Sequence, residues 1–265
     1  SVAPLVAAIF STPPDQLNSA TAVVGVVAYA VQLYFDFSGY TDMALGLAMM
    51  FGIRLPENFD RPYASRSVTE FWRRWHMSLS RWFRDYLYIP LGGNRGSAAQ
   101  TYRNLIIVFL VTGLWHGANW TFVVWGVYHG ILLLLERAAG VGRKPERPRG
   151  LRWQAVTIAL VLLGWVFFRS PDLAYALGYL RALLRPGTAV PEAIALAVDP
   201  LVVVALVFGA LSVLLPAWWV TGRQLEDPRR AFNRALRVGF FSVVLPISII
   251  MVIAGGFSPF LYFQF

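Results

Sequence analysis

The stretch LIIVFLVTGLWHGANWTFVVW, residues 105–125, indicates the fold class because it holds one histidine within an almost wholly apolar run. An ionisable ring in such surroundings is rare in membrane segments, and where it occurs it usually serves function. The Gly117-Ala118-Asn119 sequence predicts a break between two helical arms. The first arm, Leu105–Trp115, has 11 residues and would be about 16 Å long, roughly half of a bilayer core. We therefore expect a re-entrant or broken helix pair with His116 at a hinge inside the membrane, whereas two tilted full spans would place it near the outer surface.

The rest of the chain shares this apolar character. Of its 265 residues, 57% are hydrophobic and 14% are charged, against about 45–50% and about 25% in a soluble domain. Further apolar runs lie near 20–35, 40–53, 153–168, 200–219 and 236–256. The chain contains no cysteine, which excludes disulfides and thiolate metal sites. We predict an all-α integral membrane protein that forms a single membrane domain over residues 1–265.

The basic residues indicate the orientation and one kind of partner. The net charge is +9, and the basic residues fall in blocks at 61–103, 137–152 and 223–237, between apolar runs. Such blocks are typical of the cytoplasmic loops of membrane proteins. This places 137–152 and 220–238 in the cytoplasm, and 169–199 and the C-terminus outside. Anionic lipid headgroups are therefore the expected partner of these charges, and nucleic acid is not.

A second histidine lies in SVTEFWRRWHMSLSRWFRDYLY, residues 67–88. Ser67 with Glu70 three residues later predicts a helix that begins at Val68, and Pro90 ends it. One half of its helical wheel is basic and polar, and the other half is mostly aromatic and includes His76. This pattern is typical of a helix that lies in the membrane interface, although calmodulin targets and plain partner helices share it. His76 is either a packed histidine with one satisfied hydrogen bond or a functional group.

The remaining polar residues in apolar surroundings carry weaker signals. Asp36 and Asp42 lie about 120° apart on a helix, so we expect them to pair with an arginine at 54, 61 or 66 rather than to conduct ions. His129 is expected to be a packing or polar-bridge residue. The three histidines lack metal-ligand spacing, and neither a nucleophile elbow nor a phosphate-binding loop occurs in the sequence. We expect no metal site.

Three blocks of this sequence resemble a known family. They are YFDFSGYTDMALGLAMMFGIRLPENFDRPY (34–63), FWRRWHMSLSRWFRDYLYIPLGGNR (71–95) and GLWHGANWTFVVWGVYHG (113–130). They are similar to the membrane-bound O-acyltransferase family and, within it, to the alginate O-acetyltransferase branch, close to the D-alanyl-transfer protein of teichoic acid synthesis. The resemblance is dense over 29–131 and thinner from 150 to 255. It implies a multi-helix bundle of which this chain is the C-terminal half, with a loop at 1–19, a catalytic core at 29–131 and further transmembrane helices at 150–256.

The resemblance also implies an activity. A thioester donor on the cytoplasmic side, acetyl-CoA, would give its acetyl group to a hydroxyl during exopolysaccharide O-acetylation, and no cofactor would be bound. Alginate, cellulose, peptidoglycan and a periplasmic relay protein all remain possible acceptors. The expected partners are membrane lipids, the thioester donor, a periplasmic relay protein and a polysaccharide synthesis complex. The expected location is the bacterial inner membrane, with several spans.

Within the family the histidine of the GLWHG block is taken as catalytic, which implies that role for His116, and a second upstream histidine corresponds to His76. We expect His116 to be the base or a transient acyl carrier, and His76 to orient it or to donate to the thioester carbonyl. The other expected substrate-binding residues are those that would shape the tunnel, Trp115, Asn119 and Trp120, and those that would attract an anionic donor, Arg73 and Arg74 with Arg81 and Arg84. Two other functions fit the sequence: a transporter or channel, and a non-catalytic scaffold subunit of an exopolysaccharide export complex.

Overall fold

The computed structural model describes residues 2–141 and 150–214, together with scattered helical positions between 238 and 253. The regular elements within these ranges are all helices, which confirms the all-α prediction. In chain order they are α1 (Ala3–Ser11), α2 (Ser19–Met50), the 3-10 turn η1 (Pro62–Ala64), α3 (Val68–Arg74), α4 (Met77–Phe83), the π-helical turn η2 (Arg84–Tyr88), α5 (Ala98–His116), α6 (Trp120–Ala138), α7 (Leu151–Arg169), α8 (Leu173–Ala182), α9 (Glu192–Ala197) and α10 (Pro200–Leu214).

Three of the described helices, α2, α6 and α7, are long and apolar enough to cross a membrane. Helix α10 is also apolar but has only 15 residues. The span predicted at 236–256 falls mostly outside the described residues, as do the basic loop at 220–238 and the middle of the loop at 137–152. The described part therefore confirms the membrane class and leaves the predicted orientation as an expectation.

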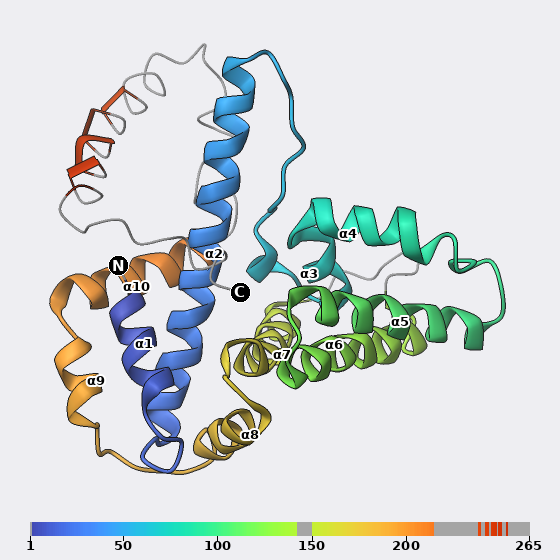
Figure 1. Ribbon diagram of the computed structural model, residues 1–265. Coiled ribbons are helices and arrows are strands. Elements are labelled where there is room, and N and C mark those ends of the chain that lie inside the picture. The colour runs from blue at the N-terminus through green and yellow to red at the C-terminus, as the bar shows by residue number, and fades with distance from the viewer. Residues whose placement is uncertain are drawn as a thin grey trace.

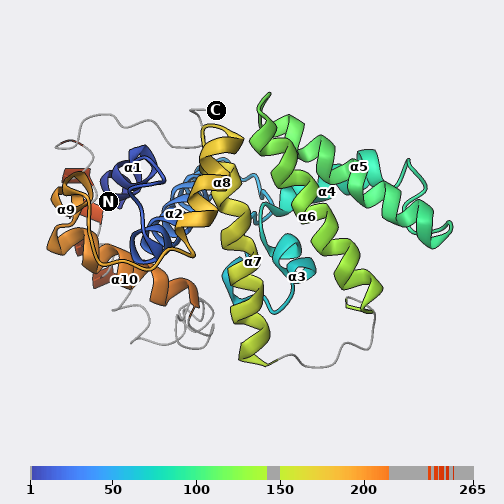
Figure 2. The same ribbon diagram turned by 90° about the horizontal axis from the view of Figure 1, so that it is seen from below.

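The helices form two groups on either side of α7 (Figures 1 and 2). On one side, α1, α9 and α10 gather around the long helix α2, which stands upright in Figure 1. On the other side, α5 and α6 run next to each other, with α3 and α4 beside them. Large aromatic side chains fill the space where the groups meet, and Tyr29, Phe71, Trp125 and Trp165 are each at most 1% exposed. The junction of the two groups is therefore the core of the molecule.

The first segment differs from its predicted form. Residues 1–19 were expected to be a loop, but residues 3–11 form α1, with Pro4 in its first turn. A proline in that position is compatible with a helix because its missing N–H would have no partner there. Leu5, Val6, Ile9 and Phe10 lie on one face and are buried, as the spacing of apolar residues in a packed helix requires.

The predicted helix at 67–88 is two helices and a π-turn. It begins at Val68 as predicted, and the Ser67 side chain accepts a hydrogen bond from the Glu70 amide at 3.0 Å. However, α3 ends at Arg74, and His76 adopts the left-handed conformation at φ 44°. The chain turns there, so one helical wheel cannot describe both sides of the turn. Trp82 and Tyr86 of the predicted inward face are accordingly 54% and 70% exposed.

Helices α5 and α6 form the predicted broken pair, with the break at Gly117–Asn119. The first arm, however, is 19 residues long rather than 11, because a capping box of Ser97 and Gln100 starts α5 at Ala98. At 1.5 Å per residue α5 is about 28 Å long, so the length argument that placed the hinge halfway through the bilayer was wrong. The two arms cross in backbone contact at Gly113 and Gly126, where neither glycine has room for a Cβ atom.

A carboxylate ties α3 to the end of α6. Both oxygens of Glu136 accept hydrogen bonds of 2.7 Å, one from the Val68 amide and the other from the amide and hydroxyl of Thr69. These amides lie in the first turn of α3, where N–H groups lack helical partners and favour a negative charge. Glu136 thereby fixes the helix that leads into His76 against the helix that follows His116.

Candidate active site

His76 and His116 line the same small cavity. Its other lining residues are Leu33 from α2, Trp75, Trp125 from α6, and Trp165 and Phe168 from α7. The space is enough for about one water molecule. Two histidines that are 40 residues apart in the sequence are thus brought to one site, and the walls around them are almost entirely apolar.

Aromatic rings hold the histidines in place. The ring of His116 makes edge-on contacts with Phe168 at 5.0 Å and with Trp125 at 5.2 Å between centroids. The ring of His76 meets Phe37 of α2 edge-on at 4.7 Å. Edge-to-face packing of this kind fixes ring orientation as well as position. The sequence patterns gave no sign of Phe168, Trp165 or Leu33, since each is one apolar residue within an apolar helix.

His76 and His116 lie outside the three candidate spans. Their surroundings lower the pKa of both rings. Burial lowers the pKa of His76 to about 4. Burial lowers the pKa of His116 to about 3, and the neighbouring His76 adds to this shift. Both rings are therefore neutral at pH 7. A neutral imidazole can accept a proton, so the cavity presents two potential bases in a site with little water.

The predicted tunnel residues lie around the hinge rather than in the cavity. Trp115 and Trp120 are 54% and 72% exposed, although the Trp115 ring contacts His116 at 4.9 Å. Asn119 accepts a hydrogen bond from the Thr121 amide and so starts α6. Its side-chain NH₂ also donates to the Pro171 carbonyl at 2.7 Å, which links the hinge to the turn after α7. These three residues lie next to His116 along the chain, while the cavity walls come from other residues.

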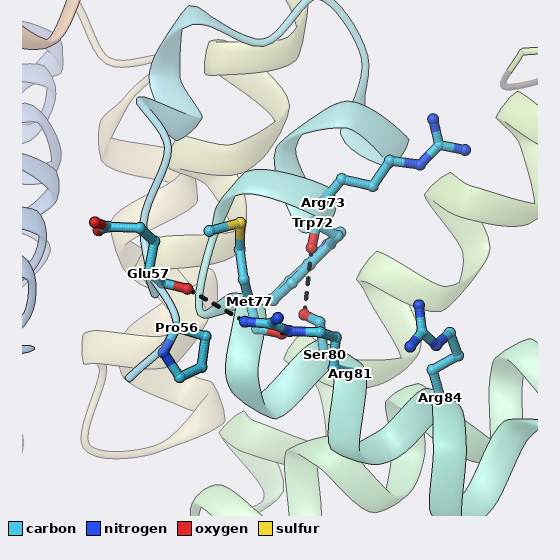
Figure 3. A pocket seen from close by; sticks show the side chains of 8 residues that line it. All are labelled: Pro56, Glu57, Trp72, Arg73, Met77, Ser80, Arg81 and Arg84. Atoms are coloured by element: carbon cyan, nitrogen blue, oxygen red, sulfur yellow. Dashed lines mark hydrogen bonds between the residues drawn. The ribbon is translucent and has the colours of Figure 1, made fainter. Parts of the chain in front are cut away.

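A groove of about 500 Å³ lies on α3, α4 and the loop that carries Pro56 and Glu57 (Figure 3). Arg73, Arg81 and Arg84 line it, together with Pro56, Glu57, Trp72, Met77 and Ser80. Arg81 donates to the Met77 carbonyl at 3.1 Å and to the Glu57 carbonyl at 3.3 Å, which holds its guanidinium over the groove. The fourth basic residue, Arg74, does not line the groove and pairs with Glu70 at 2.7 Å. The structure thus gathers three of the four predicted arginines in one place.

The remaining polar candidates lie outside the cavity. His129 is fully buried, and its Nδ1 atom accepts a hydrogen bond from Trp72 Nε1 at 3.4 Å, as expected for a polar bridge. Asp42 lines a different groove with Arg54 and Glu57. Across the part of the chain that the structure describes, no group of three or more histidine, aspartate or glutamate side chains could hold a metal ion.

Comparison with known proteins finds a family model whose matched range includes His76, His116 and the residues of the arginine groove. The family model described as "MBOAT, membrane-bound O-acyltransferase family" matches residues 6–170. The chain is 44% identical over 263 residues to the probable alginate O-acetylase AlgI of Pseudomonas putida. This alignment covers 92% of this chain and 53% of that protein.

Two further relatives match shorter stretches. The corresponding protein of Pseudomonas aeruginosa is 56% identical over 167 residues, or 63% of this chain and 32% of the relative. The peptidoglycan O-acetyltransferase of Helicobacter pylori is 49% identical over 161 residues, or 60% of this chain and 30% of the relative. The chain thus spans about a third to a half of the length of these relatives.

Proposed function

This chain belongs to the membrane-bound O-acyltransferase family, and from that premise we propose that it carries the histidine site of an enzyme that acetylates a polysaccharide. The donor would be acetyl-CoA on the cytoplasmic side, and the acceptor a hydroxyl of an alginate-like exopolysaccharide or of a protein that relays the acetyl group to it. The names of the relatives, two probable alginate O-acetylases and a peptidoglycan O-acetyltransferase, support transfer of an acetyl group to a polysaccharide. The location would be the bacterial inner membrane, next to a polysaccharide synthesis complex.

The observation that carries the proposal is the pairing of two neutral histidines in one apolar cavity. Transfer from a thioester to an alcohol needs a base, stabilisation of the tetrahedral oxyanion, and exclusion of water. In the proposed step His116 takes the hydroxyl proton while the hydroxyl oxygen bonds to the thioester carbonyl carbon. The carbon–sulfur bond then breaks, and the thiolate leaves with the proton that His116 returns. His76 orients His116 or donates to the carbonyl oxygen.

The arginine groove gives the donor a binding place. Arg73, Arg81 and Arg84 line it (Figure 3), and arginine is well suited to phosphate because its fork of N–H groups can bind two oxygens at once. We assign the phosphate groups of acetyl-CoA to this groove. Arg74 contributes charge from outside it. Trp115, Asn119 and Trp120 at the hinge would contact the incoming acceptor.

The test measures thiol release from acetyl-CoA by the purified full-length protein, with and without acceptor. His116→Ala should lower transfer about 10²–10⁴-fold, which is the usual contribution of general base catalysis, while the protein remains folded in the membrane. Wild-type transfer by this variant would refute the assignment. A transporter would move its cargo without consuming the thioester, and a scaffold subunit would tolerate the substitution.

The groove has its own test. Acetyl-pantetheine carries the same thioester without the adenosine phosphates, so wild-type protein should prefer acetyl-CoA. Arg73→Ala should raise the KM for acetyl-CoA about 10–100-fold, as expected for a lost hydrogen bond to a charged group, and leave the KM for acetyl-pantetheine unchanged. Arg152→Ala is the matched control, since Arg152 is an exposed arginine that does not line the groove. Equal effects of Arg73→Ala on both donors would exclude the groove as a phosphate site.

A further inference from the structure

The loop between α2 and η1 holds the chain at His76. The backbone carbonyl of Asn58 accepts a hydrogen bond from the Met77 amide at 2.9 Å. The side-chain oxygen of Asn58 accepts from the Ser78 amide at 3.1 Å and from the Ser78 hydroxyl at 2.9 Å. It also lies 3.3 Å from Nδ1 of His76. Asn58 is only 7% exposed, whereas Ser78 is exposed, so these contacts lie at the edge of the buried region.

This set of contacts determines which ring nitrogen of His76 carries the proton. A backbone amide can only donate, so the Asn58 atom that faces Ser78 is the oxygen, and that oxygen can only accept. The Ser78 hydroxyl gives its one proton to the same oxygen, which leaves its lone pairs for Nδ1 of His76 at 3.5 Å. The Asn58 oxygen and the Ser78 hydroxyl are therefore both acceptors toward Nδ1. In the neutral ring Nδ1 must then be the protonated nitrogen, and Nε2 carries the lone pair.

We propose that Asn58, together with Ser78, is a positioning residue that fixes His76 in the Nδ1–H tautomer. The inference about the tautomer comes from these contacts, and its consequence for catalysis rests on the proposed function. With Nε2 unprotonated, neutral His76 cannot donate to the thioester carbonyl from that nitrogen. It can only accept there, either from His116 or from the acceptor hydroxyl. Of the two roles left open for His76, the structure thus favours orientation over oxyanion stabilisation.

The choice of an amide at position 58 follows from the surroundings of His76. His116 on α5 is the titratable group across the cavity, and the walls from α2, α6 and α7 are Leu33, Trp125, Trp165 and Phe168. These walls carry no charge. A carboxylate at position 58 would accept the same hydrogen bonds but would stabilise the imidazolium and raise the pKa of His76. The amide oxygen orients the ring and leaves it neutral.

The direct test reads the tautomer without any turnover. Full-length protein labelled with ¹⁵N-histidine is reconstituted in lipid nanodiscs, and long-range ¹H–¹⁵N correlation spectra are recorded at pH 7. The His76 signals are assigned by their loss in His76→Gln. The proposal predicts an Nδ1–H pattern for His76 that becomes a mixture of tautomers in Asn58→Ala. An Nε2–H pattern in the wild type, or an unchanged pattern in the variant, would overturn it. This result does not depend on which reaction the protein catalyses.

The kinetic test uses acetyl transfer by the same protein. Asn58→Ala should lower kcat about 10–100-fold, the range known for partners that orient metal-bound histidines through their second nitrogen, with little change in KM. Asn58→Asp keeps the acceptor, so it should recover near wild-type kcat at high pH while its acid limb moves to higher pH. An unmoved acid limb in Asn58→Asp contradicts the proposal. The Asn58→Asp variant also keeps the proposal testable if Asn58→Ala does not fold, because aspartate has nearly the same shape as asparagine.

Asn104→Ala provides the matched control. Asn104 is 1% exposed and donates to the carbonyls of Leu91 and Gly93 at 3.0 and 3.1 Å. Its loss therefore removes a buried amide of similar structural importance without touching a histidine. We expect lower stability with an unchanged pH profile and an unchanged His76 spectrum. If Asn104→Ala reproduced the profile of Asn58→Ala, the role of Asn58 would be structural only.

Discussion

The crossing of α5 and α6 controls the position of His116, and adding one methyl group tests this. In Gly113→Ala the new Cβ atom would lie 2.3 Å from the carbonyl oxygen of Phe122. An ordinary contact of this kind begins at 3.4 Å, so the two helices must separate by about 1 Å at that point. The obstructing atom belongs to the backbone and cannot rotate away. His116 follows only three residues later, so the displacement reaches its ring.

The size of the effect follows from that displacement. Overpacking a close contact costs about 1–3 kcal/mol of stability, and a misplacement of about 1 Å can cost about 10²-fold in rate. We therefore expect Gly113→Ala to unfold more easily and to lose about 10²-fold in kcat at saturating donor. Thiol release gives the rate, and thermal unfolding of the purified full-length protein gives the stability.

The control is the same substitution where there is room for it. A Cβ atom at Gly46 of α2 would meet nothing within 4 Å, and alanine favours a helix over glycine by about 0.5–1 kcal/mol. Gly46→Ala should therefore be at least as stable as the wild type and equally active. If Gly113→Ala also kept wild-type rate and stability, the close crossing would not position His116 and the reasoning would fail.

Two further predictions concern the charge of the histidines and the anchor of α3. Burial lowers the pKa of His76 to about 4 and that of His116 to about 3. We therefore expect kcat/KM to stay flat from pH 8 to about pH 5 and to fall at lower pH. An acid limb near 6.5 would instead show that the two histidines titrate like ordinary exposed ones. The same lowered pKa values predict that the free energy of unfolding is highest above pH 6.5 and declines as the pH is lowered further. The reason is that below pH 6.5 the unfolded chain binds protons that the folded histidines do not. Unfolding measured at a series of pH values checks this. Glu136→Gln replaces a carboxylate that accepts three hydrogen bonds from the first turn of α3. We expect the free energy of unfolding, measured with denaturant, to fall by about 1–3 kcal/mol. No change in stability would show that α3 is held by apolar packing alone.

Several features of the fold carried a local signal in the sequence. The Ser67 cap and the Gly117–Asn119 break gave the start of α3 and the hinge correctly. A second capping box, Ser97 with Gln100, is an equally local signal, and it starts α5 well before the apolar run that begins at Leu105. Helix α1 likewise had its signal in a proline followed by spaced apolar residues.

Other features had no local signal. His76 takes a left-handed backbone conformation that favours glycine, and the contacts from Asn58 hold the chain in it. Those contacts join residues that are 18 and 20 positions apart across a loop. The periodicity of apolar residues carries no information about such contacts, so the sequence pattern predicts an unbroken helix. The sequence could therefore single out both histidines, but the arrangement that brings them together required the structure.

The central claim is that His76 and His116 act as one site, and a double-mutant cycle tests it most directly. Thiol release from acetyl-CoA is measured for full-length wild type, His76→Ala, His116→Ala and the double variant, with folding verified for each. Residues that work as a unit are strongly non-additive, so the double variant should lose little more activity than His116→Ala alone. If the two losses instead multiplied as independent factors, or if His76→Ala kept wild-type activity, the two histidines would not form a single catalytic site.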